Sequence, residues 1–318
     1  MRQVDAQDLK HTGRLGQIGI CLGKLFRLFI YQSDWKVLPM AAIIAGLVAM
    51  VVGGSTFVNM EGTQTGTFAL TCVCIWNGFF NSIQVICRER AILKREHRAG
   101  LHITSYVAAH MIYQMCLCAI QAGVTLFVCV LVRMPLPETG LLIASPVLEI
   151  YLTLFFITYA SDMMALMISA IVHTTTTAMT VMPFLLIIQL LFSGGFFSLP
   201  ASLNSLTDLM ISKWGMQALC ISGNFNGLPS VTIWNTLVSV GGGVSLGNGM
   251  TLGNVLAMIQ ENGGREVILQ EMAKMSQNPN YNYDLQNLLA CWGFLALFSI
   301  IYAFIAVVFL EAIDKDKR

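Results

Sequence analysis

Charged residues are scarce in this chain. They make up 11% of its 318 residues, whereas a soluble domain usually carries about 25%. Hydrophobic residues account for 56%, and the formal net charge is only +1. This composition excludes an ordinary soluble domain and gives no basis for nucleic-acid binding. It predicts an integral membrane protein.

Recognisable catalytic and metal-binding motifs are also missing. A phosphate-binding loop needs G-x-x-x-x-G-K-[ST], and the nearest segment, GKL at residues 23–25, lacks the leading glycine and the hydroxyl that binds Mg²⁺. The nine cysteines lie in apolar stretches without metal-ligand spacing, so we expect them to pack as small apolar residues. We therefore expect no ATPase activity, no bound metal and no bound cofactor in this chain.

Signals for an intramembrane enzyme or an ion-driven carrier are absent as well. Asp162, Glu149 and His110 lie in or near apolar runs, but no H-E-x-x-H, G-x-S-x-G or paired-aspartate pattern accompanies them. We expect Asp162 to pair with a neighbouring helix. No internal repeat is visible, which argues against an inverted-repeat transporter, and no cleavable signal peptide is expected.

Six apolar runs are near or above the roughly 20 residues that cross a bilayer. They cover residues 37–58, 67–87, 103–132, 141–172, 178–199 and 288–312. If the N-terminus lies in the cytosol, fourteen of the 18 lysines and arginines fall on the cytosolic side, in agreement with the positive-inside rule. The sequence thus predicts an all-α plasma-membrane protein with six transmembrane helices and both termini in the cytosol.

Two further segments complete the predicted organisation. Between residues 15 and 31, apolar residues alternate with Lys24 and Arg27, which predicts an amphipathic interfacial helix or an N-terminal extension of the first span. Residues 198–286 are too long for a turn and too apolar for disorder, so we expect a folded external or re-entrant loop. The predicted parts are the cytosolic N-terminus with its interfacial helix (1–36), five spans (37–197), the external loop (198–286), and the sixth span with a cytosolic tail (287–318).

The segment after the second span, residues 88–101, predicts a short cytosolic helix. Its apolar and basic residues would offer different sides: Ile92, Leu93 and Leu101 against Arg88, Arg95 and Arg98. Gly100 can end such a helix. A charged, ordered helix at the inner membrane face is suited to docking a cytosolic partner. The alternative is a basic anchor that contacts only lipid headgroups.

Three segments carry a family resemblance. They are Glu89-Arg90, Arg95-Glu96, Gly100 and Tyr106 after the second span, then FSGGFFSLP at 192–200, then SKWGMQAL at 212–219 with NFNG at 224–227. In order and spacing they resemble the membrane domain of the G subfamily of ABC transporters, the White and pleiotropic-drug-resistance type. Lys213-Trp214 departs from the usual Arg-Tyr of that family, and residues 229–283 have no counterpart in it.

The resemblance implies the membrane half of an ATP-driven exporter for an amphipathic or lipid-like substrate. Family members work as dimers, either of one chain or of two, and an ABC ATPase subunit or domain binds ATP and Mg²⁺. The start at Met1 favours a separate ATPase chain over a removed domain. The implied ATPase-coupling residues are Glu89, Arg90, Arg95, Glu96 and Gly100. The alternative function is a non-transporting scaffold, immunity or sensor component with the same fold and the same contact with membrane lipids.

The resemblance also implies a substrate cavity at the dimer axis, between the second and fifth spans. The corresponding residues are Asn77, Phe80, Asn81, Ile187 and Leu190, below a constriction at Gly195 and Phe196. The residues themselves support a polar stripe, because Asn77, Asn81 and Gln84 have the spacing of one helical face. The alternative is that these amides form hydrogen bonds between helices.

Overall fold

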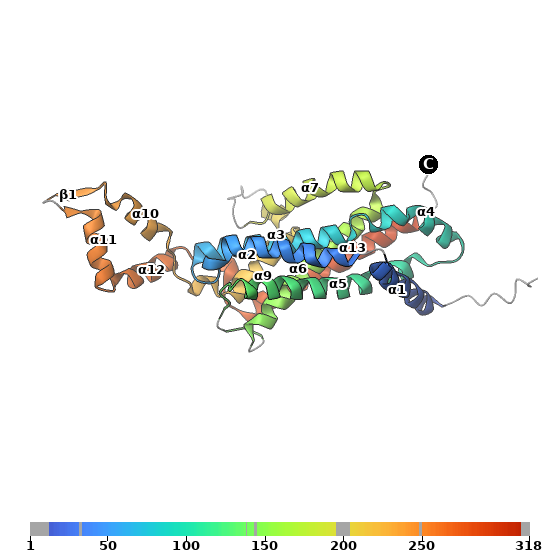
Figure 1. The fold of residues 1–318 in the computed structure, drawn as a ribbon, viewed down its shortest axis with the longest axis horizontal. Coiled ribbons are helices and arrows are strands. Elements are labelled where there is room, and N and C mark those ends of the chain that lie inside the picture. Colours follow the sequence, from blue (N-terminus) through green and yellow to red (C-terminus); the bar gives the residue numbers. More distant parts are fainter. Residues whose placement is uncertain are drawn as a thin grey trace, which may run out of the picture.

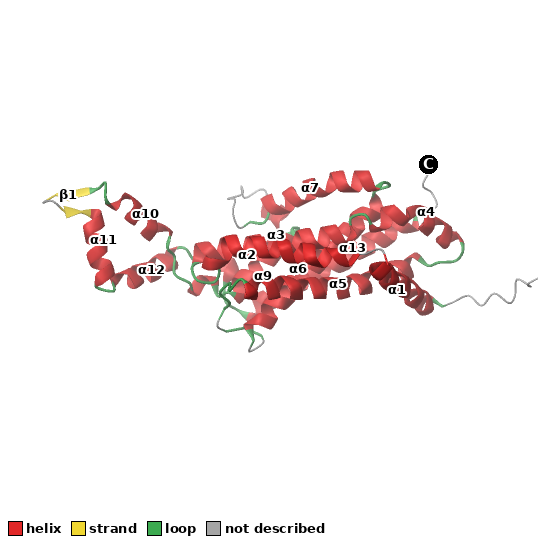
Figure 2. Cartoon of the chain, in the orientation of Figure 1, coloured by secondary structure: helices red, strands yellow, loops and turns green. Residues whose placement is uncertain are grey.

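The structure, a computed structural model, describes residues 13–31, 34–137, 139–142, 145–194, 204–247 and 250–312. In these ranges it is an elongated bundle of helices with a small lobe projecting beyond one end (Figure 1). Strands within the described residues are confined to the tip of this lobe, as Figure 2 shows.

Five helices among the described residues are long and apolar enough to cross a membrane. Their helical bodies are α2 (Val37–Val52), α3 (Met60–Ser82), α5 (Ile103–Leu131), α6 (Pro146–Ile171) and α13 (Leu285–Glu311). The described residues are mostly helical, which agrees with the predicted all-α membrane protein. Helix α7 (Thr175–Leu191), which corresponds to the fifth predicted span, has 17 residues, whereas the first span reaches 19 because helical turns continue α2 to Ser55. The count of six spans stays a prediction.

Helix α3 begins at Met60 rather than near residue 67, although its first turns are polar. Asn59 caps it, with its side-chain oxygen accepting from the Gly62 amide at 2.7 Å. The hydroxyls of Thr63, Thr67 and Thr71 each donate to the carbonyl four residues earlier, at 2.7 to 2.8 Å. Because these hydroxyls are satisfied within the helix, α3 can bury Thr63, Thr67 and Thr71 although they are polar.

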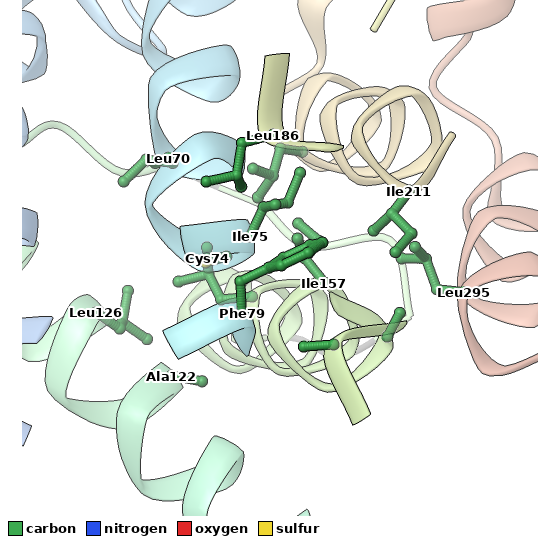
Figure 3. Packing of buried hydrophobic residues seen from close by; sticks show 14 of the residues in the cluster. Leu70, Cys74, Ile75, Phe79, Ala122, Leu126, Ile157, Leu186, Ile211 and Leu295 are labelled. Atoms are coloured by element: carbon green, nitrogen blue, oxygen red, sulfur yellow. The ribbon is translucent and has the colours of Figure 1, made fainter. Parts of the chain in front are cut away.

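The core of the bundle lies where α3 crosses α6. Gly78 makes this crossing possible, since a side chain there would collide with the Thr158 carbonyl oxygen and the Asp162 amide nitrogen. Figure 3 shows Phe79 of α3 beside Ile157 of α6, with side chains from α5, α7 and α13 around them. Close packing of small residues is how membrane helices associate without a hydrophobic driving force between them.

One end of the bundle carries two short helices that do not cross it. Helix α1 (Arg14–Tyr31) lies across this end, beside α5, and α4 (Val85–Arg98) follows α3 there (Figure 1). The one-turn helix η2 (Asp34–Lys36) lies between α1 and α2, so α1 is a helix separate from the first span. Phe26 and Phe29 of α1 pack edge-on against Tyr113 of α5, with ring centroids 5.5 and 6.4 Å apart.

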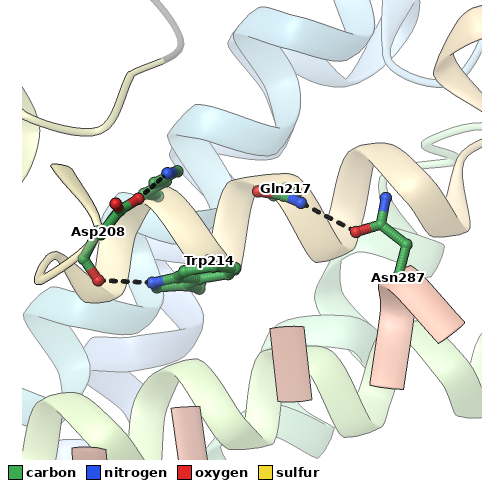
Figure 4. A network of polar contacts seen from close by, with 5 residues as sticks. Asp208, Trp214, Gln217 and Asn287 are labelled. Carbon is green, nitrogen blue, oxygen red and sulfur yellow. Dashed lines mark hydrogen bonds and ion pairs between the residues drawn. The ribbon is translucent and has the colours of Figure 1, made fainter. Parts of the chain in front are cut away.

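The opposite end holds the connection between α7 and α13. The connection includes α8 (Asn204–Thr207), α9 (Ile211–Ser222), η5 (Phe225–Gly227) and η6 (Pro279–Tyr281), and η3 (Gly53–Ser55) joins α2 to α3 at the same end. Helix α9 is packed among α3, α6 and α13. Trp214 donates from Nε1 to the Asp208 carbonyl at 2.8 Å, and Gln217 donates to Asn287 at 3.2 Å (Figure 4). The Trp214 ring also stacks on Phe294, with ring centroids 4.0 Å apart.

The lobe projects from this opposite end. It consists of α10 (Thr232–Gly241), β1 (Ser245–Gly247), β2 (Met250–Thr251), α11 (Leu252–Glu261) and α12 (Gly264–Met275). Trp234, Leu256 and Leu269 form a small core of its own. This lobe is built from the residues for which the family resemblance offered no counterpart.

Candidate functional site

Helix α4 is fixed to the end of α6 by two reciprocal caps. The backbone amides of Ile86 and Cys87 in the first turn of α4 donate to Ser169 Oγ at 3.0 and 3.1 Å. In return, Arg90 Nη1 donates to the carbonyls of Ala170 and Val172 at the end of α6, at 2.7 and 3.3 Å. Each helix satisfies terminal groups of the other, which would otherwise lack partners.

Helix α4 is also bound to α1 at two places. Lys24 Nζ lies 3.3 Å from Glu89 Oε2 and 3.8 Å from Glu96 Oε1. Gln17 donates to the Gly100 carbonyl at 3.1 Å and accepts from the His102 amide at 2.9 Å, so its amide holds both sides of the turn that follows α4. As a result, α4 cannot shift without displacing either α1 or the end of α6.

The remaining side of α4 is exposed. Arg88, Ile92, Arg95 and Arg98 recur every three or four residues, so they share one helical face that points away from the bundle. Ile92 is 42% exposed at the centre of this basic face. On the other side, Ile86 and Leu93 are buried against residues of α5, α6 and α13. We call the exposed side, residues 88, 92, 95 and 98, the outer face of α4.

The predicted ATPase-coupling residues are distributed over both sides of α4. Glu89, with a side chain only 16% exposed, and Arg90 face α1 and α6. Glu96 faces Lys24 but keeps 42% of its side chain exposed. Arg95 belongs to the outer face, and Gly100 closes the turn after the helix with a φ of 103°, a conformation that favours glycine. Contact of these residues with an ATPase stays a prediction.

The polar stripe of α3 faces neighbouring helices in the single chain. Asn81 forms a reciprocal amide pair with Gln121 of α5, at 2.8 and 2.9 Å. Two turns from Gln121 along α5, Gln114 donates to Ser82 at 2.6 Å. Asn77 is 4% exposed, and its amide nitrogen has no hydrogen-bond partner among the described residues. For Asn81, the interhelical hydrogen bonding that the sequence left open is present.

The apolar residues of the predicted cavity are more exposed. Phe80 of α3 is 41% exposed and Ile187 of α7 is 51% exposed, whereas Leu190 is partly buried. Gly195 and Phe196, the predicted constriction, lie outside the described residues, which stop at Gly194 and resume at residue 204. The structure of the single chain thus places two of the five predicted cavity residues clearly on the outer surface.

Several residues of the site escaped prediction from the sequence. Ser169 caps α4 from a different helix, and a lone serine near a helix end carries no sequence signal for that role. Lys24 was recognised only as a basic interfacial residue. Its pairing had one available clue, because Glu89 and Glu96 are seven residues apart and therefore share a helical face.

Glu61 is a further unpredicted residue, at the opposite end of α3. Its carboxylate accepts from the hydroxyls of Ser230 and Thr232 at 2.7 Å, and from the amides of Val231 and Thr232 at 3.1 Å. It therefore caps the start of α10 and ties the lobe to the bundle.

Comparison with known proteins gives one family match and one similar protein for this chain. The family described as ABC-2 type transporter matches residues 16–222, a range that runs from α1 to the end of α9 and stops before the lobe. The chain is also 27% identical over 223 residues to the ABC transporter ATP-binding/permease protein Rv1747 of Mycobacterium tuberculosis. That similarity covers 66% of this chain but only 26% of the relative. The chain thus spans about a quarter of the length of the relative that it matches.

Proposed function

The chain belongs to the ABC-2 type transporter family, and we propose that it forms the membrane-spanning half of an ATP-driven exporter of the G subfamily type. In this proposal an ABC ATPase subunit or domain binds ATP and Mg²⁺, and this chain, which lacks a Walker A motif, hydrolyses no ATP itself. The name of the mycobacterial relative combines an ATP-binding part with a permease, which supports such a partnership.

The observation that carries the proposal is the way in which α4 is held. Its outer face offers three arginines around Ile92 to a partner, while its inner side is capped by Ser169 and bound to Lys24. A partner that moves on ATP binding would shift α4, and the shift would pass to α6 and α1. Coupling of this kind needs contacts that differ between two arrangements, and α4 supplies a rigid element for them.

The distribution of basic residues supports a cytosolic position for α4. The described lysines and arginines at the α4 end are Arg14, Lys24, Arg27, Lys36, Arg88, Arg90, Lys94, Arg95 and Arg98. Those at the opposite end are Arg133, Lys213, Arg265 and Lys274. By the positive-inside rule the α4 end faces the cytosol and the lobe lies on the outer side of the membrane. The membrane in this proposal is the plasma membrane.

The exposed apolar residues of α3 and α7 support a dimer with a cavity at its axis. Trp76 and Phe80 of α3 are each 41% exposed, and Phe184 and Ile187 of α7 are 62% and 51% exposed. Two copies of such surfaces, or one copy and a related chain, would enclose an apolar space with few polar groups. A space of this kind suits an amphipathic or lipid-like substrate.

Reconstitution of the chain with its ATPase subunit or domain in liposomes tests this function. We expect ATP hydrolysis that is stimulated by amphipathic compounds, and ATP-dependent movement of the same compounds across the bilayer. An ATPase that binds the chain but is neither stimulated nor linked to movement of any such compound would instead show a non-transporting scaffold or sensor.

A further inference from the structure

A cavity of about 340 Å³ lies between α1, α3, α4 and α5, at the α4 end of the bundle. Much of its wall is apolar, with Leu25 and Leu28 from α1, Ile83 directly after α3, and Leu117 from α5. Its volume falls at the lower end of the roughly 300–1,000 Å³ typical of small-molecule sites. The cavity would hold a single acyl chain, but it is too small for a whole lipid with two chains.

Two buried polar side chains of α5 line this cavity without a complete set of partners. His110 is 1% exposed, and within the described ranges neither of its ring nitrogens has a hydrogen-bond partner. Gln114, one turn further along, is also 1% exposed; its amide nitrogen bonds to Ser82, but its Oε1 is without a partner among the described residues. Buried polar groups are normally satisfied, so these two favour a ligand with polar atoms of its own.

The rim of the cavity is polar and charged. Gln84, Arg88 and Glu89 line it where α4 begins; Arg88 is exposed, and the Glu89 carboxylate is paired with Lys24 at 3.3 Å. Helix α1, which forms one wall, carries its apolar residues among basic ones, as helices at a membrane interface do. The apolar part of the cavity would therefore lie at the level of the inner leaflet, and Arg88 on its rim at the level of the lipid phosphates.

We propose that this cavity binds a single-chain glycerophospholipid, a lysophospholipid, from the inner leaflet. Its acyl chain lies between Leu25, Leu28 and Leu117, and its phosphate lies at Arg88. The ester carbonyl accepts from the N–H of a neutral His110, and the free glycerol hydroxyl donates to Gln114 Oε1. In a diacyl lipid this glycerol hydroxyl is esterified, and the cavity is too small for the second acyl chain. The site therefore discriminates against diacyl lipids.

Binding to this site can be measured on the chain without an ATPase and without transport, although Arg88 also belongs to the outer face of α4. Phe80 and Asn81 also line the cavity, which places the bound lipid beside the substrate cavity proposed above. Because lipid binding is measured without ATP, a negative result for transport would leave the lipid site standing, and a negative result for lipid binding would leave the transport proposal standing.

The test is photo-crosslinking in membranes that contain the full chain. The probe is 1-acyl lysophosphatidylglycerol with a diazirine in its acyl chain, and the crosslinked peptides are identified by mass spectrometry. We expect labelling in α1 and α5, with competition by unlabelled lysophosphatidylglycerol at least about tenfold stronger than by its diacyl counterpart. Labelling confined to other helices, or equal competition by the two lipids, would overturn the proposal.

Variants locate the site. Leu28→Trp fills the cavity and should lower the labelling about tenfold, whereas Ile20→Trp, on the exposed side of the same helix at 65% exposure, should leave it unchanged. His110→Phe keeps an aromatic ring, removes both ring nitrogens, and should weaken competition by the lysolipid several-fold. If Leu28→Trp does not accumulate in the membrane, the His110→Phe comparison decides. Labelling of every variant equal to that of the unaltered chain would exclude the site.

Discussion

Replacement of Ser169 by alanine tests whether α4 is held by α6. Ser169 is fully buried, and its Oγ is the acceptor for two amides in the first turn of α4, at 3.0 and 3.1 Å. Loss of a capping hydroxyl costs about 0.5–2 kcal/mol. Both amides lie in a buried part of the structure where a water molecule cannot easily replace the serine, so we expect the upper half of this range, about 1–2 kcal/mol.

A cost of that size should appear as local opening of α4. One to two kcal/mol corresponds to a roughly 5- to 30-fold change in the equilibrium between closed and open forms. Hydrogen–deuterium exchange of peptides that cover residues 85–93 should therefore become faster by about that factor in the Ser169→Ala variant. Exchange in α9, at the opposite end of the bundle, should not change.

A second buried serine provides the control. Ser299 of α13 is 2% exposed, and its hydroxyl donates to the Leu295 carbonyl of its own helix at 3.0 Å, so it caps no other helix. Ser299→Ala should leave the exchange of residues 85–93 unchanged. If Ser169→Ala left this exchange within twofold of the unaltered chain, or if both variants accelerated it equally, the capping argument would be refuted.

Three further predictions concern other contacts. Lys24→Glu should lower partner-stimulated ATP hydrolysis, and the double variant Lys24→Glu with Glu89→Lys should recover it. The coupling energy in a double-mutant cycle should be only about 0.5 kcal/mol because the pair is partly exposed. Equal activity of the single and double variants would contradict this. Glu61→Ala should release the start of α10 and speed trypsin cleavage of the lobe. Glu61→Gln keeps one acceptor oxygen and should speed the cleavage less. Unchanged cleavage in both variants would show that Glu61 does not hold the lobe. Asn81→Leu should lower the free energy of unfolding, measured in detergent, by about 1 kcal/mol, because it leaves the buried Gln121 amide without its hydrogen-bond partner. The double variant Asn81→Leu with Gln121→Leu should restore part of this loss. An unchanged free energy of unfolding in the single variant would show that the pair adds no stability.

The transmembrane helices were predictable from the sequence because the thickness of the bilayer fixes the length of an apolar run. The apolar run of the fourth span begins at residue 141, but α6 begins at Pro146, which stands in the first turn where its missing N–H costs nothing. The start of α3 was misplaced because hydropathy counts Glu61 and Thr63 as polar, although each is satisfied by a specific partner. Such partners are set by tertiary structure, so a sliding average over the sequence cannot detect them.

The functional site was predictable as a segment, but the orientation of its residues was not. Charge alternation and the family resemblance both pointed to residues 88–101, and the structure places a helix, α4, over residues 85–98. Which residues of that helix face outward depends on where α1 and α6 lie. Glu89 and Arg90 are engaged by Lys24 and by the end of α6, and neither contact follows from spacing along one helix.

The central claim is that the outer face of α4 binds the ATPase. The most direct measurement is the affinity of the ATPase subunit or domain, supplied in trans, for the full chain in lipid nanodiscs, with Arg95→Glu and Arg133→Glu compared. Both variants reverse one exposed arginine, but Arg133 lies at the opposite end of the bundle. We predict binding at least about tenfold weaker for Arg95→Glu, because a reversed charge at an interface faces its former partner as a like charge, and unchanged binding for Arg133→Glu. Equal affinity of the ATPase for the unaltered chain and both variants would contradict the account.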